Sequence, residues 1–233
     1  MGQRHTAVDL MPKVRDILQN GHTYHEEYYA AETFGGPSLH FHQRALGLRG
    51  EVSESLKPEL IYAVLSSWGM HRMGKGGPKM NAFDRFANSV KLMSDDLETL
   101  RLCSPASMTM ESWSRLKRVF EGIQVMASGT SLVGNSKVMA HLLPNIVSPI
   151  DREYTLEFLF GNKNIQNDLN EEWLLMRKIL EEFFHPIVND RAFQRTAALW
   201  ISSQTRYPWD TSILKVADNL VIGAMKQRVK RTP

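Results

Sequence analysis

The chain has 233 residues, of which 42% are hydrophobic and 23% charged, a balance typical of a globular protein with a substantial core. Its formal net charge of +3 is compatible with a nucleic-acid partner without requiring one. The single cysteine, Cys103, excludes an intramolecular disulfide and a cysteine-based zinc or iron–sulfur site. Neither a signal peptide nor a long apolar run is present, so we expect a cytoplasmic protein, nucleoid-associated if bacterial, with no membrane contact.

Apolar residues recur at helical spacing along most of the chain, and alternating strand patterns are scarce. The first helix is expected to end at Asn20-Gly21 and the next to run over 24–33, with a short helix in the ambiguous segment 39–50. Further helices are predicted at 55–68, 81–93, 95–102, 111–126, 137–143, 151–160, 171–184, 191–203 and 211–228. The pattern predicts an all-α fold of about ten helices.

The segment 130–154 contains the pattern most informative about function. A predicted turn at Leu132 to Ser136 leads into a short helix, and a helix N-terminus leaves backbone N–H groups that favour an anion. We therefore predict a helix-hairpin-helix motif near 120–143 that grips a DNA phosphate. The predicted phosphate-binding residues are Val133, Gly134, Asn135, Ser136 and Lys137. The alternative is an ordinary turn between two helices that contains a glycine.

An acid follows this turn, since Asp151 stands at the expected start of the next helix after Pro149-Ile150. A carboxylate near a sugar can stabilise developing positive charge and orient or deprotonate an attacking water. A purely structural alternative is that Asp151 caps its helix. The two interpretations are compatible with each other.

Three short strings resemble the helix-hairpin-helix DNA glycosylase superfamily, of the endonuclease III and oxoguanine glycosylase type. PELIYAVLSSWGM is similar to that family's Leu-Ser-Gln-Gln/Ala-Thr helix, LVGNSKVMAHLL to its hairpin, and PIDREYTLEFL to its aspartate segment. The resemblance covers roughly residues 57–160 and implies two lobes, which we place at 52–160 and at 1–51 with 161–233. It also implies that Asp151 is catalytic and that duplex DNA carrying a modified or damaged base is the partner. We further expect a monomer without cofactor.

The resemblance has departures. The hairpin has one glycine, Gly134, where the family usually has two, and Ser136 falls where bifunctional members place their lysine. Lys137 is one residue later and would point about 100° away on a helix. We therefore expect a monofunctional enzyme in which Lys137 contacts phosphate.

A glycosylase must hold an extruded base between aromatic or apolar side chains. The candidates for the base pocket are Trp68 and Tyr28, with Tyr24 and Tyr29 as further possibilities. The glycine-rich loop 69–79 could supply a wedge into the duplex through Met70, His71 or Arg72. For each of these residues, core packing or plain exposure is the simpler alternative.

Other patterns point to weaker alternatives. His22, His25, Glu26, His40 and His42 follow no standard metal-binding motif, so no metal is expected. Arg115, Lys117 and Arg118 form either a solvated helix face or a DNA-binding face. Two functions remain: a DNA glycosylase acting in repair or against modified foreign DNA, and a non-catalytic helical DNA-binding or adaptor protein.

Overall fold

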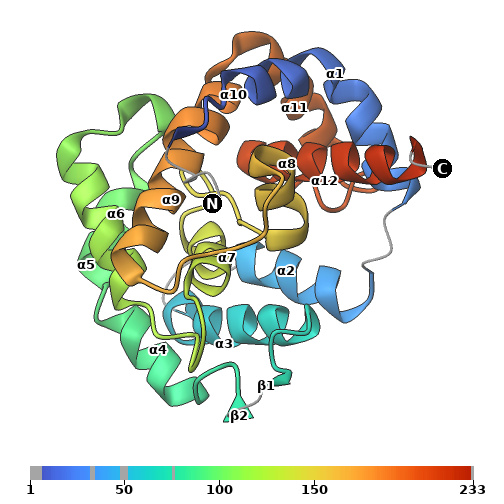
Figure 1. Ribbon diagram of the computed structural model, residues 1–233. Helices are drawn as coiled ribbons and strands as arrows, with labels where there is room; N and C mark the ends of the chain where they lie inside the picture. The colour runs from blue at the N-terminus through green and yellow to red at the C-terminus, as the bar shows by residue number, and fades with distance from the viewer. Residues whose placement is uncertain (1–6, 32–34, 48–51, 75–76, 232–233) are drawn as a thin grey trace.

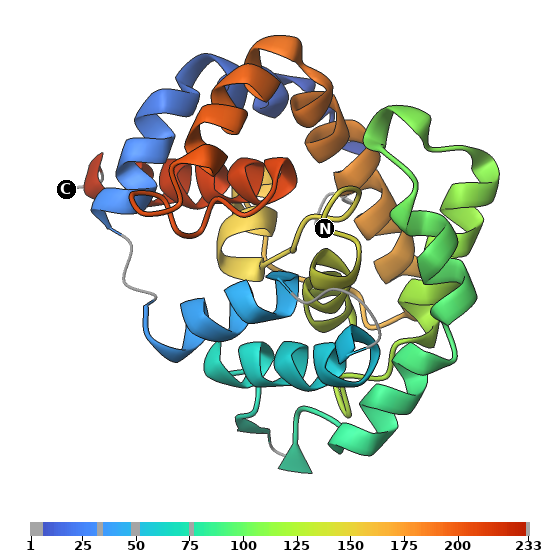
Figure 2. The ribbon, with the colours of Figure 1, turned by 180° about the vertical axis from the view of Figure 1, so that it is seen from behind.

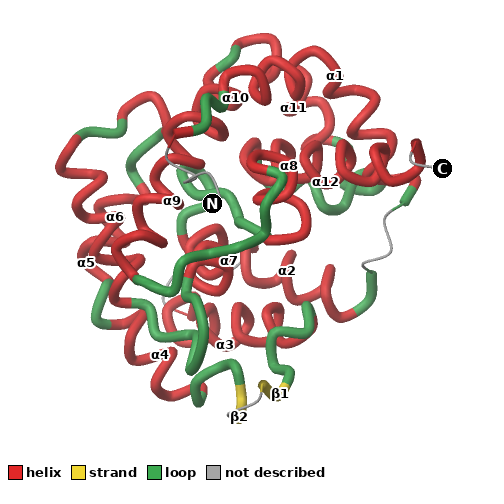
Figure 3. The backbone as a smooth tube through the Cα atoms, viewed as in Figure 1, coloured by secondary structure: helices red, strands yellow, loops and turns green. Residues whose placement is uncertain are grey.

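The computed structural model describes residues 7–31, 35–47, 52–74 and 77–231. The chain is 71% helical, which confirms the predicted all-α class. The strands in the described part of the chain are β1 (Met73–Gly74) and β2 (Gly77–Pro78), two short pieces paired antiparallel in the loop after α3 (Figure 3). Residues 32–33, 48–51 and 75–76 of the predicted helices and loops lie outside the described residues.

The helices follow one another with short connections (Figure 1). In chain order they are α1 (Met11–Ala30), α2 (Pro37–Gly47), α3 (Val52–Ser67), α4 (Phe83–Lys91), α5 (Ser94–Arg101), the 3-10 turn η2 (Pro105–Ser107), α6 (Met110–Gly122), α7 (Leu132–Leu142), the π-helical turn η3 (Arg152–Leu156), α8 (Glu157–Phe160), α9 (Leu169–Ile179), the π-helical turn η4 (Leu180–Phe184), α10 (His185–Asn189), α11 (Arg191–Ser202) and α12 (Ile213–Arg231).

Helix α7 lies at the centre of the fold, and α2, α3, α6 and α9 pack around it (Figures 1 and 2). Its buried residues include Leu132, Val138 and Met139, so the helix is covered on most sides. The segment that follows it, 143–151, leads directly to η3 and α8, which pack on α12. The segment 130–154, which the sequence identified as informative about function, therefore begins with a central buried helix.

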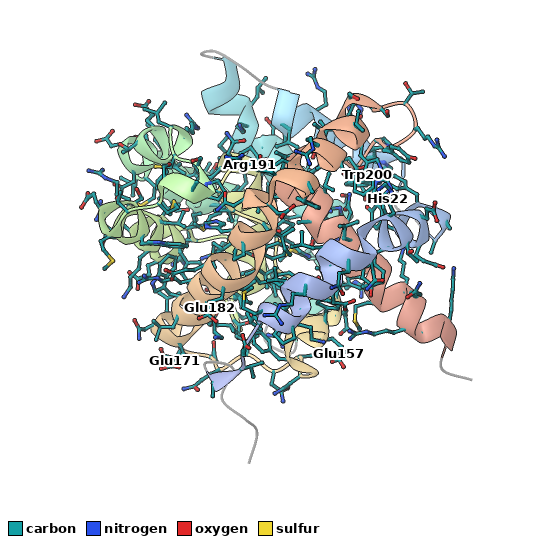
Figure 4. The ribbon with its side chains drawn as sticks, turned by 90° about the horizontal axis from the view of Figure 1, so that it is seen from above. His22, Glu157, Glu171, Glu182, Arg191 and Trp200 are labelled. Atoms are coloured by element: carbon teal, nitrogen blue, oxygen red, sulfur yellow. The ribbon has the colours of Figure 1, made fainter. Side chains whose placement is uncertain are left out.

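Helices α1 and α12 come from distant parts of the chain and make the most extensive helix–helix contact in the fold. Small residues bring their backbones together: a Cβ on Gly223 would lie 1.9 Å from the carbonyl oxygen of Tyr24. On the outer side of α1, His22 meets Trp200 of α11 edge to face, with ring centroids 5.2 Å apart (Figure 4).

Two predicted breaks do not occur. Gly21 lies inside α1, where a Cβ would make an ordinary 3.4 Å contact with Leu220, so the predicted end at Asn20-Gly21 was wrong. The helix predicted to stop before Pro186 continues from α9 through η4 into α10. The π-helical turn widens the backbone before Pro186, and Pro186 occupies the first turn of α10, where its missing N–H is tolerated.

The described helices also pack across the predicted lobe division. Helix α2, assigned to the lobe of 1–51, packs on α3 and α7, and α9, assigned to the same lobe, packs on α6 and α7. The side of the molecule around α7 therefore draws on more of the chain than the segment 52–160.

Candidate functional site

A cleft of about 160 Å³ opens between α1, α3, α7, η3 and α12. A cavity of about 150 Å³ is enough to hold a benzene ring, so this one accommodates a single planar ring. Four aromatic side chains line it: Tyr28, Trp68, Tyr154 and Trp209. Five charged side chains share the lining: Lys137, Asp151, Lys215, Asp218 and Lys226.

Lys137 and Asp151 form an ion pair on one wall of this cleft. The Lys137 Nζ donates to Asp151 Oδ2 at 3.1 Å, and the two side chains are 14% and 30% exposed. The same ammonium lies 5.4 Å from the ring centroid of Trp68. The wall thus combines an amine, a carboxylate and an aromatic face.

The sequence predicted that Lys137 points about 100° from the direction of Ser136 and contacts phosphate; in the structure Lys137 pairs with Asp151, and the phosphate contact stays a prediction. Lys137 falls in the middle of α7, five residues after the helix begins, and this phase of the helix turns it towards Asp151. Reading 132–136 as a turn placed the start of the helix too late.

Asp151 is held in place by its own helix. Its Oδ1 accepts from the backbone N–H groups of Glu153 at 2.8 Å and Tyr154 at 3.4 Å, and its own N–H donates to Thr155 Oγ1 at 3.1 Å. The helix cap offered as the structural alternative is present. Because the cap uses Oδ1 and Lys137 uses Oδ2, one carboxylate serves both.

A buried hydroxyl connects α7 to the segment that carries this acid. Ser136 Oγ accepts from the backbone N–H of Ile150 at 3.1 Å and donates to the carbonyl of Val133 at 3.2 Å. Ser136 is fully buried. It fixes the residue before Asp151 against the residue before Lys137, so it positions the ion pair rather than a phosphate.

The predicted phosphate-gripping hairpin at 132–136 is corrected by the structure. These residues form the first turns of α7, and the connection between α6 and α7 is the loop 123–131. The N-terminus of α7 does bind a carboxylate, but it is the buried Glu172 of α9, whose Oε2 accepts from the N–H of Leu132 at 2.6 Å. Burial raises the pKa of Glu172, and the hydrogen bonds from Leu132 and Ser131 lower it.

The other predicted hairpin residues have packing roles. Gly134 admits the loop 123–131, because a Cβ there would lie 2.7 Å from Met126 Cγ and 3.0 Å from Val125 Cγ1. Asn135 is buried and donates through Nδ2 to the carbonyls of Phe120 and Ile123, which closes the end of α6. Val133 is partly exposed but lies within the helix. Gly134, Asn135 and Ser136 are buried, and the N–H of Asn135 donates to the carbonyl of Ser131 within the helix.

The cleft lining holds a second ion pair, on α12, that sequence reasoning missed. Lys215 Nζ donates to Asp218 Oδ2 and to Asn219 Oδ1, both at 2.6 Å. The network continues from Asn219 Nδ2 to Asp210 Oδ1 at 2.7 Å, and Asp210 Oδ2 contacts His25 Nε2 at 2.7 Å. Burial raises the pKa of the Asp218 carboxyl, Lys215 lowers it, and the nearby Asp151 raises it.

A signal for this ion pair was present in the sequence. Lys215, Asp218 and Asn219 are spaced three and four residues apart in a largely apolar helix, KVADNLVIG. Burying a charged side chain is costly unless an oppositely charged or polar group pairs with it, so this spacing on an apolar helix predicts a buried ion pair.

The remaining predicted residues divide into two groups. Trp68 and Tyr28 line the cleft. Met70 packs partly buried against the core, His71 donates through Nδ1 to the carbonyl of Ser66 at 2.7 Å, and Arg72 is exposed. None of these three lines the cleft, so the role of a wedge stays a prediction.

Other patterns have structural explanations. Arg115 and Arg118 pair with Asp96 at 2.9 and 2.8 Å, and these arginines, Arg118 first, lower the pKa of Asp96. Lys117 pairs with Glu121 at 3.6 Å. In the described part of the chain, no three His, Cys, Asp or Glu side chains gather as a metal site would require.

Comparisons of this chain with protein-family models, curated proteins and solved structures gave no match. Among the described helices, none combines the length and the apolar character needed to cross a bilayer.

Proposed function

We propose that the protein releases a modified or damaged base from duplex DNA by breaking its N-glycosidic bond in this cleft. The observation that carries the proposal is the Lys137–Asp151 pair, 3.1 Å apart, on the wall of a cleft that fits one ring between aromatic side chains. Base-modifying enzymes need such a site because their target atom is inaccessible inside a duplex.

The chemistry follows from the charges. Breaking the bond between a base and its sugar develops positive charge at the sugar, and the carboxylate of Asp151 would stabilise that charge. Asp151 is also placed to orient a water or take its proton as the water attacks the anomeric carbon and the base departs with the bonding electrons. Trp68 and Tyr28 supply faces on which the extruded base can stack.

The position of Lys137 favours a second route within the same function. After giving a proton to Asp151, the amine of Lys137 could itself attack the anomeric carbon as the base departs with the bonding electrons. Loss of a second amine proton and cleavage of the bond from the anomeric carbon to the ring oxygen, which takes up a proton, would then give a covalent imine with the opened sugar. This route makes Lys137 a nucleophile, whereas the hydrolytic route leaves it as the partner that holds Asp151. Reduction by borohydride during the reaction traps only the covalent species.

The cleft also suits an anionic polymer. Lys137, Lys215 and Lys226 supply three cationic side chains against the two carboxylates Asp151 and Asp218, and the excess of positive charge favours phosphate near its opening. Binding by such contacts weakens as salt rises.

The test uses duplexes that each carry one modified or damaged base, with the released base identified by mass spectrometry. We expect release by the unaltered chain, loss of about 10²-fold or more in Asp151→Asn, and unchanged binding of duplex by that variant. Asp190→Asn is the matched control, because Asp190 is also a partly buried acid that caps a helix, with Oδ1 accepting from Phe193 N–H at 2.8 Å.

The alternative, a non-catalytic DNA-binding protein, predicts salt-sensitive duplex binding and no base release from any of these substrates. Lys137→Met compared with Lys178→Met separates the two chemical routes, since Lys178 is also an ion-paired lysine, only 10% exposed, on α9. Borohydride trapping that persists in Lys137→Met would exclude Lys137 as the nucleophile.

A further inference from the structure

Two histidines meet beside the cleft. His42 of α2 and His141 of α7 are both buried, and His42 Nδ1 lies 3.0 Å from His141 Nε2. The pair continues at both ends: His42 Nε2 lies 3.0 Å from Thr211 Oγ1, and His141 Nδ1 lies 2.7 Å from the carbonyl oxygen of Lys137. Four groups from three parts of the chain thus form one continuous series of hydrogen bonds.

The polarity of this series is fixed by its last member. A carbonyl oxygen only accepts, so His141 Nδ1 must carry the hydrogen, and in a neutral ring His141 Nε2 is then an acceptor. His42 Nδ1 must therefore donate, which leaves His42 Nε2 to accept from the hydroxyl of Thr211. Only one arrangement of hydrogens satisfies every neutral group: Thr211 to His42 to His141 to the Lys137 carbonyl.

The surroundings keep both rings uncharged at neutral pH. Burial lowers the pKa of His42 well below its ordinary value, and His141 and Lys215 lower it further. Burial lowers the pKa of His141 to about 4, the carbonyl of Lys137 opposes this, and the charges of Lys57, Lys215 and Lys137 add to it. Both imidazole rings are thus uncharged, and the lysines near them disfavour their protonation.

The two rings stand between aromatic walls of the cleft. The ring centroid of His42 is 5.0 Å from that of Trp209 and 6.3 Å from that of Trp68, and His141 is 5.7 Å from Trp68. Both tryptophans line the cleft, and a small hollow beside the histidines shares Trp68, Pro149 and Lys215 with it. His42 therefore contacts both tryptophans, and His141 contacts Trp68.

We propose that His42 and His141 are positioning residues: a directional hydrogen-bonded relay that sets the spacing of Trp68 and Trp209 and fixes the turn of α7 that carries Lys137. The inference concerns the shape of the cleft, and it rests on the proposed function only for what the cleft binds. Loss of either ring would leave its partner with an unsatisfied buried nitrogen and free Trp68 to move away from Lys137.

The first test is nitrogen NMR of the full chain labelled at histidine. We expect both rings to carry hydrogen on Nδ1 and neither to titrate between about pH 8 and about pH 5, a range in which an ordinary histidine changes charge. A hydrogen on Nε2 of either ring, or an ordinary titration, would overturn the relay without any variant being made.

The second test measures access to Lys137 with pyridoxal 5′-phosphate, an aromatic aldehyde that forms an imine with an amine and is fixed by borohydride. Labelling of Lys137 is compared with labelling of Lys13, which lies over Phe158 of α8 at 4.8 Å and is not part of the cleft lining. In His42→Leu and His141→Leu we expect the Lys137 to Lys13 ratio to rise about fivefold, and in the double variant no further.

The matched control is His40→Leu, an exposed histidine on the same helix as His42, for which the ratio should not change. An unchanged ratio in the two relay variants, with both folded, would show that the pair has a packing role alone. Failure of every duplex to release a base would end the proposed function and leave both of these measurements valid.

Discussion

The hydroxyl of Ser136 and the backbone N–H of Ile150 are 3.1 Å apart and buried, and this one hydrogen bond joins α7 to the segment bearing Asp151. Lys137 follows Ser136 and Asp151 follows Ile150, so the geometry of the ion pair depends on a contact one residue away on each side. The sequence predicted Ser136 as a phosphate contact, whereas in the structure its hydroxyl links the two segments that carry Lys137 and Asp151.

Ser136→Ala should therefore loosen the ion pair and destabilise the fold. Removing the hydroxyl leaves the buried N–H of Ile150 without an acceptor, a loss of about 1–3 kcal/mol in the free energy of unfolding. Urea denaturation measures it. Ser114→Ala is the control, because Ser114 Oγ is exposed and bonds only the carbonyl of Met110 in its own helix; an equal loss in both variants would contradict the role given to Ser136.

Glu172→Gln should remove a pH dependence while keeping the cap of α7. The pKa of Glu172 is raised, so between its unfolded value near 4.5 and its higher folded value the unfolded chain holds fewer protons, and stability falls as pH rises. Gln has the same shape and can still accept from Leu132 N–H. Thermal melts across this window should be flatter in Glu172→Gln than in the unaltered chain, and Glu172→Leu should be destabilised by about 1–3 kcal/mol at every pH because the buried N–H loses its acceptor.

Acid should destabilise the fold through the histidine pair. The pKa of His141 is about 4 in the folded state, whereas an unfolded histidine titrates near 6.5, so the unfolded chain binds more protons between these values and stability falls as pH falls. The full contribution of this residue is roughly 3 kcal/mol, reached near pH 4. For each chain, the acid-induced loss is the fall in the free energy of unfolding from its own value at about pH 7. This loss should be smaller in His141→Leu than in the unaltered chain. Equal losses in the two chains would contradict the lowered pKa assigned to His141.

Gly223→Ala should prevent the normal packing of α1 on α12. The new Cβ would lie 1.9 Å from the carbonyl oxygen of Tyr24, which is backbone and cannot rotate away, so the helices must separate. We expect the free energy of unfolding, measured by urea denaturation, to fall by more than the about 1–3 kcal/mol that is usual when a core is overpacked. Gly21→Ala is the control on the other helix of this pair, because its new Cβ would make an ordinary 3.4 Å contact with Leu220. This variant should leave the free energy of unfolding unchanged or raise it by about 0.5–1 kcal/mol through helix propensity.

Much of the fold could be predicted because its information is local. The periodic apolar residues gave the all-α class, and Asp151 after Pro149-Ile150 correctly indicated a helix start. Asp151 and Trp68, chosen from short strings, line one cleft, while their chemical roles stay predictions. What failed was the first turn of α7: nothing local distinguishes a glycine-containing turn from a helix whose N-terminus is capped by Glu172, forty residues further on.

The orientation of Lys137 and the wall formed by Lys215 could not be predicted for the same reason. The direction of a side chain on a helix depends on where that helix begins, and an error of five residues changes it. Lys215 reaches the cleft because α12 packs on α1, a contact between segments some two hundred residues apart.

That contact also bears on how the protein matures in the cell. Tyr28 of α1 and Lys215 of α12 line the same cleft, so the cleft is incomplete until α12 has been translated. A nascent chain that ends before residue 213 would lack Lys215, Asp218 and the other residues that α12 contributes to this cleft.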